Sequence, residues 1–156
     1  MTNLTKRLTF CGAQVGLCLL AAAPAPAATA WTSGGQRAGL AAKGGGETIG
    51  FSCAGIPAGR MRLVLSGFDA KLLQTDLDYT VVVTVDGTAY RQSLRAVAGA
   101  PGRRDLSMTG PSGELQPLVE ALAAGAKAEI ASPAGREPLS LKGSGKALKA
   151  LRAACS

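Results

Sequence analysis

The sequence predicts a mainly β protein, either an antiparallel β-sandwich or a curved sheet, with about seven or eight short strands, one inserted helix and one C-terminal helix. Three observations lead to this prediction. Several short stretches alternate apolar and polar side chains, which is the period of a strand. Breaks that contain Gly or Pro separate these stretches. Apolar residues at helical spacing occur in two later segments, around Leu115–Leu122 and along the last residues of the chain.

Residues 1–30 have the composition of a cleaved signal peptide. Two basic residues precede an apolar stretch, best developed over Val15–Ala23, and residues 28–30 place alanine at the −3 and −1 positions of a cleavage site. A membrane anchor is the alternative, but this apolar run is short and interrupted, whereas a span needs about 20 mostly apolar residues. We therefore expect one periplasmic or secreted domain, Trp31–Ser156, with no stable membrane span after cleavage.

Three strands are expected before the centre of the chain. Within Glu47–Cys53, Ile49, Phe51 and Cys53 alternate with smaller or polar residues, so Cys53 should point into the core. The three expected strands are Arg37–Lys43, Glu47–Cys53 and Met61–Ser66. A flexible lead-in, a glycine turn and a helical turn are expected at residues 31–35, 44–46 and 69–74.

The centre of the sheet is expected to be a hairpin over Tyr79–Arg95. Asp86-Gly87 favours a two-residue type I′ turn, because both residues tolerate positive φ. Such a turn pairs Val85 with Thr88 and gives the hairpin two different faces. The face expected to be buried carries Tyr79, Val81, Val83, Val85, Thr88, Tyr90, Gln92 and Leu94. The polar face carries Thr80, Val82, Thr84, Ala89, Arg91 and Ser93.

A loop, a strand, a helix, a second hairpin and a terminal helix should complete the chain. The inserted helix is expected to hold Pro117 in its first turn and to end just before Gly125. Ser144 is a suitable N-cap for the terminal helix, and Pro138 indicates an edge strand. The loop is expected at Ala98–Arg104, and the strands at Arg104–Thr109, Ala126–Ser132 and Arg136–Lys142.

Two of the four cysteines lie in the segment that should be removed, which leaves Cys53 and Cys155. A pair of cysteines in an exported chain indicates a disulfide. This disulfide would join an early strand to the terminal helix and act as a structural staple, because the chain lacks the C-x-x-C pattern of redox sites. Free, buried thiols are the alternative.

The residues for common catalytic chemistry are missing from the sequence. The chain contains no histidine, which removes Ser-His-Asp and Cys-His catalysis and histidine-ligated metal sites. Asp69, Asp76 and Asp78 lie close together in sequence, but they lack the glycine and glutamate of a calcium loop. The glycine-rich segments match no phosphate-binding loop. We therefore expect no catalytic residues, no metal and no cofactor.

The basic residues are the remaining indication of a binding surface. Without Lys6 and Arg7 the net charge falls from +7 to +5, a mild excess that ordinary solubility also explains. Few aromatic residues accompany these charges, so nucleic acid is not an expected partner. Two clusters are candidates for contact with a protein or an anionic envelope component. They are Arg91, Arg95, Arg103 and Arg104 around the hairpin, and Lys146, Lys149 and Arg152 on the last helix.

One group of known proteins shares part of this pattern. Trp31 lies near the expected mature start, Cys53 ends an early strand, and the segment 139–148 (LSLKGSGKAL) leads to a final Cys155. In this layout the chain resembles small exported proteobacterial proteins of the invasion-associated locus B type. The resemblance implies a β-rich periplasmic or envelope domain without a known enzymatic role, and it assigns no functional residue.

These observations favour an exported non-enzymatic domain that binds a protein or an envelope component. One alternative is an inhibitor of an exported enzyme, with the segment Ala98–Arg104 entering the target's cleft. A second alternative is a hydrolase that uses carboxylates alone, drawn from Asp69, Asp76 and Asp78.

Overall fold

A computed structural model describes residues 30–41 and 47–156, and the expected signal peptide and glycine turn lie outside the described residues. The chain forms one antiparallel sheet of nine strands, with one helix inserted before β8 and one at the C-terminus. The strands are β1 (Trp31–Gly34), β2 (Arg37–Ala41), β3 (Glu47–Ser52), β4 (Arg60–Asp69), β5 (Asp78–Val85), β6 (Thr88–Ala98), β7 (Arg103–Pro111), β8 (Ala128–Ser132) and β9 (Gly135–Leu139). The helices are α1 (Ser112–Ala124) and α2 (Ser144–Ala154).

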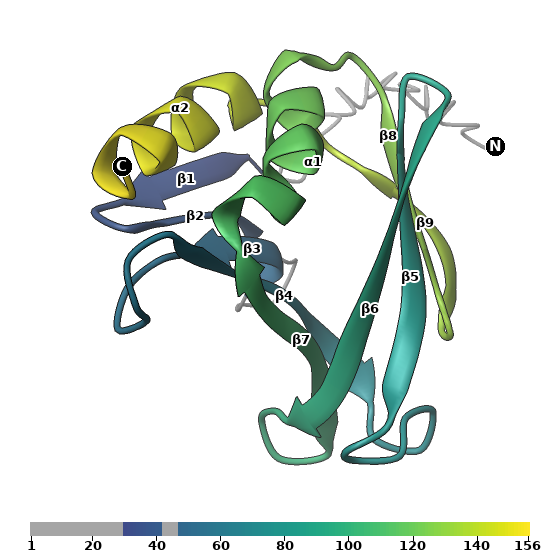
Figure 1. Cartoon of the computed structure of the whole chain (residues 1–156). Helices are drawn as coiled ribbons and strands as arrows, with labels where there is room; N and C mark the ends of the chain where they lie inside the picture. The colour runs from purple at the N-terminus through teal and green to yellow at the C-terminus, as the bar shows by residue number, and fades with distance from the viewer. Residues whose placement is uncertain (1–29, 42–46) are drawn as a thin grey trace, which may run out of the picture.

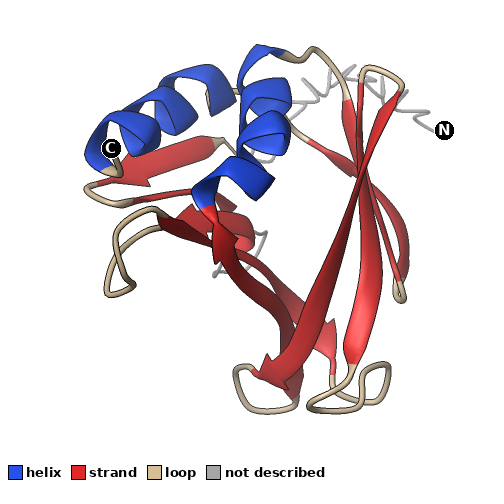
Figure 2. Ribbon diagram, viewed as in Figure 1, coloured by secondary structure: helices blue, strands red, loops and turns tan. Residues whose placement is uncertain are grey.

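The sheet has the strand order β1-β2-β3-β4-β7-β6-β5-β8-β9. It curls like half of a barrel, so that β1–β4 face β5, β8 and β9, and the two helices cover one end (Figures 1 and 2). The predicted curved sheet with two helices is therefore confirmed, with nine strands in place of seven or eight. Pro138 lies in β9, which is an edge strand, as predicted.

The central hairpin has the predicted register. Val85 pairs with Thr88 and Tyr79 with Leu94, and both turn residues have positive φ, 47° at Asp86 and 87° at Gly87. The predicted apolar face is buried in part: Val81, Val83, Val85 and Leu94 are 0–4% exposed, whereas Tyr79, Tyr90 and Gln92 are half-buried and Thr88, beside the turn, is exposed. The buried side chains from both helices join these strand residues in one hydrophobic core. The helical contributors are Leu115, Leu118, Val119 and Leu122 from α1, and Ala147, Leu148 and Leu151 from α2.

The prediction of a flexible lead-in at residues 31–35 is wrong, because residues 31–34 form β1, a strand that the sequence did not predict. Trp31 is 5% exposed, its ring stacks on Phe51, and its indole N–H donates to the Ser140 carbonyl at 2.8 Å. Its backbone N–H donates to the Lys142 carbonyl at 2.9 Å. Partners from distant parts of the chain therefore order a segment whose own sequence has no strand signal.

Several local predictions also need correction. Residues 70–77 form an irregular loop with turns and no helix. The loop expected over Ala98–Arg104 is shorter, because Ala98 belongs to β6 and Arg103 and Arg104 to β7, which leaves a tight turn at residues 99–102. Because α1 begins at Ser112, Pro117 lies in its second turn. Gly143, not Ser144, is the N-cap of α2, and the Ser144 hydroxyl donates to the Leu141 carbonyl at 2.8 Å.

The predicted disulfide between Cys53 and Cys155 is present. It joins the residue after β3 to the residue after α2, across a sequence separation of 102 residues and a Cα–Cα distance of 5.9 Å. α2 also packs against β1 and β2, so the bond connects the last helix to the end of β3, the strand next to those that it covers. None of the helices in the described ranges is long and apolar enough to cross a membrane.

Candidate functional site

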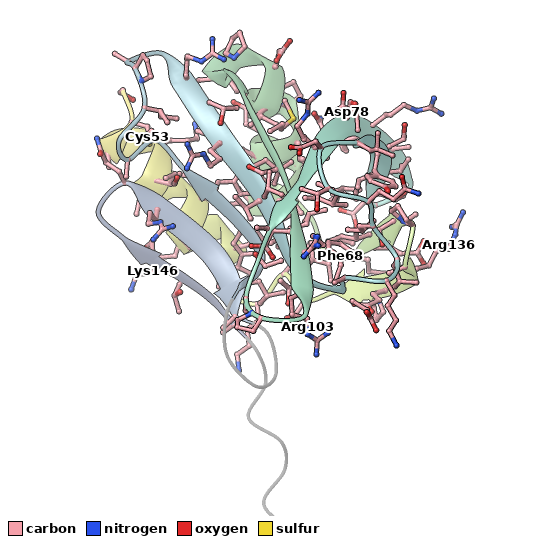
Figure 3. The ribbon with its side chains drawn as sticks, turned by 90° about the horizontal axis from the view of Figure 1, so that it is seen from below. Cys53, Phe68, Asp78, Arg103, Arg136 and Lys146 are labelled. Carbon is pink, nitrogen blue, oxygen red and sulfur yellow. A yellow bond between two sulfur atoms is a disulfide. The ribbon has the colours of Figure 1, made fainter. Side chains whose placement is uncertain are left out.

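Two connections lie together at the end of the sheet away from the helices (Figures 1 and 3). One is the loop at residues 70–77 between β4 and β5, and the other is the turn at residues 99–102 between β6 and β7. The Ala70 N–H donates to the Gly102 carbonyl at 3.1 Å, which joins the two connections directly. We call this region the loop end.

Leu73 fastens the loop to the core. Its side chain is 3% exposed and belongs to the hydrophobic core, although residues on both sides of it are exposed. The loop backbone is held as well: the Asp76 N–H donates to the Ala96 carbonyl, and the Ala96 N–H donates to the Leu77 carbonyl, both at 2.8 Å. The Gln74 N–H donates to the Tyr79 hydroxyl at 2.8 Å. This loop is therefore a fixed element of the structure.

The same loop presents two leucines to solvent. Leu72 is 51% exposed and Leu77 is 48% exposed, and no other large hydrophobic side chain is exposed in residues 30–41 and 47–156. An isolated exposed leucine needs no explanation, but two exposed leucines in one anchored loop are candidates for contact with a partner.

Three of the predicted basic residues lie at the loop end. Arg103 donates to the Gly67 carbonyl at 3.0 Å, and Arg104 Nε donates to Thr75 Oγ1 at 2.8 Å. Arg95 Nε lies 3.1 Å from Asp78 Oδ1, with both side chains more than half exposed. This hydrogen bond, together with the charge of Asp78, raises the pKa of Arg95 above its usual value.

The loop end carries charges of both signs. The register of β4 against β7 shifts between Leu65 and Phe68, and beyond the shift Phe68 pairs with Arg104 and Asp69 with Arg103. Figure 3 shows Phe68, Asp78 and Arg103 on this side of the molecule. Cations and carboxylates balance in number, so this surface is not a purely basic patch. The cations are Lys71, Arg95, Arg103 and Arg104, and the carboxylates are Asp69, Asp76, Asp78 and Asp105.

The structure separates the remaining predicted basic residues from this end. Arg91 lies on β6 opposite Val82, four residues and therefore about 13 Å along the strand from Arg95. Lys146 and Lys149 are exposed on α2, which covers the opposite end of the sheet. Arg152, also on α2, forms an ion pair with Glu120 of α1 at 3.2 Å. The seven residues therefore occupy separate regions and do not form one surface.

The three aspartates proposed for hydrolysis do not share a described cavity. Asp69 lines a cavity of about 150 Å³ with Glu137, and neither Asp76 nor Asp78 contributes to its lining. Asp78 is engaged with Arg95. Among the residues with described positions, no group of three or more His, Cys, Asp or Glu side chains is placed to hold a metal ion.

The sequence did not predict that Leu72 and Leu77 would be exposed. The segment Asp69–Gln74 was expected to be a helical turn, in which adjacent leucines would point to different sides. A sequence signal exists, because two adjacent leucines stand in an otherwise polar connection between strands. It does not indicate which leucine faces the core.

Comparisons of this chain with protein-family models, with curated proteins and with solved structures produce no match.

Proposed function

We propose that this protein is an exported, non-enzymatic domain that binds a partner protein of the cell envelope through its loop end. The single observation that carries the proposal is the arrangement of Leu72 and Leu77 in a loop that Leu73 and backbone hydrogen bonds hold in place. A fixed loop loses little conformational entropy on binding, which favours affinity.

The composition of the loop end favours a protein over an anionic polymer or membrane surface. Protein interfaces combine a small apolar centre with a polar rim, and arginine is enriched in them. Leu72 and Leu77 would provide apolar contacts, and Arg104, which donates to Thr75 of the same loop, and the exposed Arg103 would provide polar ones. An anionic polymer would favour a surface of one charge sign, but here aspartates balance the cations.

Three sequence features support the exported setting. They are the signal-like residues 1–30, the pairing of Cys53 with Cys155, and the resemblance to exported envelope proteins. The periplasm and the extracellular space are both compatible with them.

Site-specific photocrosslinking tests the proposal. A photoreactive amino acid replaces Lys71 at the loop end or, as a matched control, Arg91 on the outer face of β6, and each protein is irradiated in an envelope extract. We expect a discrete adduct from position 71 that is absent from position 91. A second variant with Leu72→Ser and Leu77→Ser should reduce this adduct about tenfold, because interface anchors contribute most of the binding energy.

Two outcomes would contradict the proposal. One is an adduct at position 71 that persists undiminished in the Leu72→Ser/Leu77→Ser variant. The other is the same set of adducts from positions 71 and 91, which would indicate nonspecific contact. Circular dichroism of each variant confirms that a lost adduct does not reflect unfolding.

Inhibition of an exported enzyme is a more specific form of the same proposal. The turn at residues 99–102 is internally hydrogen bonded, with the Arg103 N–H donating to the Ala100 carbonyl at 2.8 Å. Pro101 restricts it further. A rigid, protruding turn of this kind suits insertion into an enzyme cleft, and Pro101→Gly should then weaken inhibition while leaving the Lys71 adduct detectable.

A further inference from the structure

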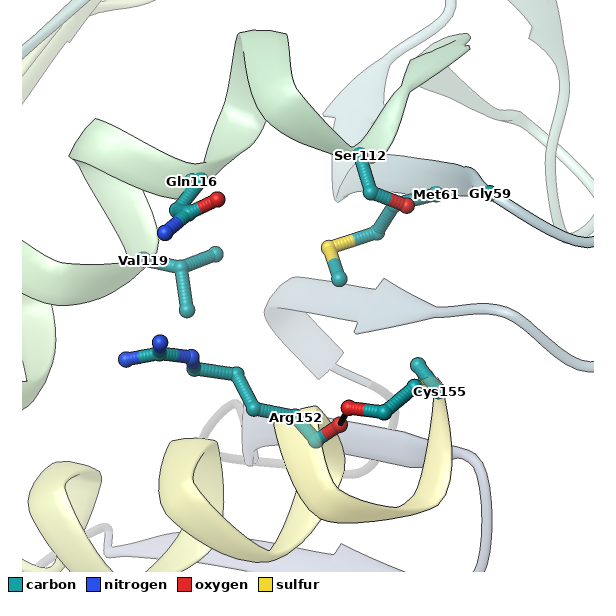
Figure 4. A pocket seen from close by; sticks show the side chains of 8 residues that line it. Gly59, Met61, Ser112, Gln116, Val119, Arg152 and Cys155 are labelled. Carbon is teal, nitrogen blue, oxygen red and sulfur yellow. Dashed lines mark hydrogen bonds between the residues drawn. The ribbon is translucent and has the colours of Figure 1, made fainter.

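A second candidate site lies at the opposite end of the molecule, beneath the two helices. A cavity of about 350 Å³ opens between the start of β4, the start of α1 and the end of α2 (Figure 4). This volume lies within the range of small-molecule sites. The residues that matter for its chemistry are Met61, Ser112, Gln116, Val119, Arg152 and Cys155.

One part of the cavity wall is apolar. Met61 on β4 and Val119 on α1 line it, each with a small part of its side chain, because they are only 4% and 1% exposed. Cys155 adds half of the disulfide to the same wall, so the end of α2 is fixed here. This wall suits the apolar body of a ligand.

A cation lies across the cavity from part of this wall. In Figure 4 the guanidinium of Arg152 faces Val119 and Gln116. Glu120 holds Arg152 at 3.2 Å and also accepts a hydrogen bond from Gln116 Nε2 at 2.8 Å. The remaining guanidinium N–H groups have no partner in the described part of the chain. Lys149 borders the adjoining groove together with Arg152 and Glu120, so the net charge of these three residues is positive.

The cavity also adjoins a buried hydroxyl without a partner. Ser112 Oγ is inaccessible to solvent, and among the described residues it is the one buried side-chain N or O atom without a hydrogen bond. Its backbone N–H is satisfied by the Gly59 carbonyl at 2.8 Å, and α1 has no side-chain cap. Buried polar groups are normally satisfied, so this hydroxyl marks a place in the cavity wall where packing leaves a polar group without a partner.

We infer that this cavity binds a small amphipathic carboxylate. Its apolar body lies along Met61 and Val119, and its carboxylate accepts hydrogen bonds from Arg152. Arg152 can retain its ion pair with Glu120 at the same time, because a guanidinium offers five N–H donors. The shared chemistry, a carboxylate on a short apolar body, occurs both in fatty acids and at the C-terminus of a peptide that ends in an apolar residue. This inference is independent of the proposed partner at the loop end.

Methyl NMR of the full chain provides a direct test. With ¹³C-methyl methionine, Met61 reports on the cavity and Met108, which does not line it, serves as an internal control. The probes are octanoate, octanol as its uncharged counterpart, and N-acetyl-leucine as a peptide terminus. We expect octanoate or N-acetyl-leucine to shift the Met61 signal at millimolar concentration, with Met108 unchanged and octanol weaker.

Matched variants separate the charge from the cavity. Arg152→Gln should weaken binding of the carboxylate about five- to tenfold and leave octanol unchanged, whereas Arg91→Gln should change neither. Met61→Trp should fill the cavity and abolish binding of every probe, followed in this variant by equilibrium dialysis of the probes.

The carboxylate that binds more tightly identifies the source, a fatty acid or a peptide terminus. A Met61 signal that no probe shifts would mean that the cavity holds only water and would overturn the inference. Equal affinity for octanoate in Arg152→Gln and in the unmodified protein would overturn the assignment of a carboxylate. The Leu72→Ser/Leu77→Ser variant should bind octanoate normally, so failure of this inference is distinct from failure of the proposed function.

Discussion

Substituting alanine for each of the neighbouring leucines at the loop end tests the anchoring of the loop most directly. Leu73 is 3% exposed and Leu72 is 51% exposed, so two chemically identical changes remove very different contacts. Burying a leucine side chain contributes about 1.5–3 kcal/mol, and Leu→Ala in a core costs about 2–5 kcal/mol once the residual cavity is included. Because this site lies at the edge of the core and can partly collapse, we expect about 2–3 kcal/mol for Leu73→Ala.

Leu72→Ala should lower the free energy of unfolding by no more than about 0.5 kcal/mol, as is usual for exposed positions. With a urea m-value of about 1.5 kcal/mol/M, the Leu73→Ala midpoint should lie about 1.3–2 M below that of the unmodified protein. The fluorescence of Trp31, the single tryptophan, which is 5% exposed, reports the transition.

Equal urea midpoints for the two variants would refute the reasoning, because they would show that Leu73 does not anchor the loop. The binding assay should give a complementary result. Leu72→Ala should reduce the photocrosslinked adduct from position 71 while the protein keeps its stability. This result would separate the role of Leu72 in binding from the role of Leu73 in stability.

Three further substitutions test other parts of the structure. Replacing Cys53 and Cys155 together by alanine should lower the free energy of unfolding by up to about 4.7 kcal/mol, the value of the chain-entropy model for a separation of 102 residues. An unchanged urea midpoint would contradict a stabilising role of the disulfide. Backbone N–H groups of residues 126 and 127 donate to the Asp86 carboxylate and lower its pKa in the folded protein. The stability lost in Asp86→Asn should therefore be constant above about pH 4 and should shrink as the pH falls through this lowered pKa. A stability difference that grows on acidification would contradict this explanation. Gly125→Ala should cost about 1–3 kcal/mol in thermal or urea unfolding, because a Cβ there would collide with Val85 and lie 2.8 Å from the Ala121 carbonyl, and full stability would show that the contact relaxes freely.

Gly125 ends α1 as predicted, but the structure gives a different reason for a glycine at this position. The sequence suggests a glycine that ends a helix in the left-handed conformation, but its φ is −73° and its backbone is extended. The requirement for glycine comes from the close approach of Val85, Asp86 and Ala121. That approach depends on how α1 packs against the hairpin, and no local pattern encodes it.

Asp86 shows the opposite case. Its turn with Gly87 is encoded locally, because few residues accept two consecutive positive φ values, and the predicted hairpin register follows from it. The second role of Asp86, as acceptor for N–H groups of residues 126 and 127, depends on a segment about forty positions away. The turn could be predicted, whereas this connection to the start of β8 could not.

The β class, the register of the central hairpin, the two helices and the cysteine pair could be predicted from the sequence, because alternation, turn chemistry and composition act over a few neighbouring residues. Tertiary packing places Trp31 in a strand, buries Leu73 while leaving Leu72 and Leu77 exposed, and pairs Asp78 with Arg95 at a mixed-charge loop end. It also brought Met61, Ser112 and Arg152 around one cavity. These features arise from contacts between residues far apart in the chain, and such contacts exist only after the sheet has curled and the helices have packed.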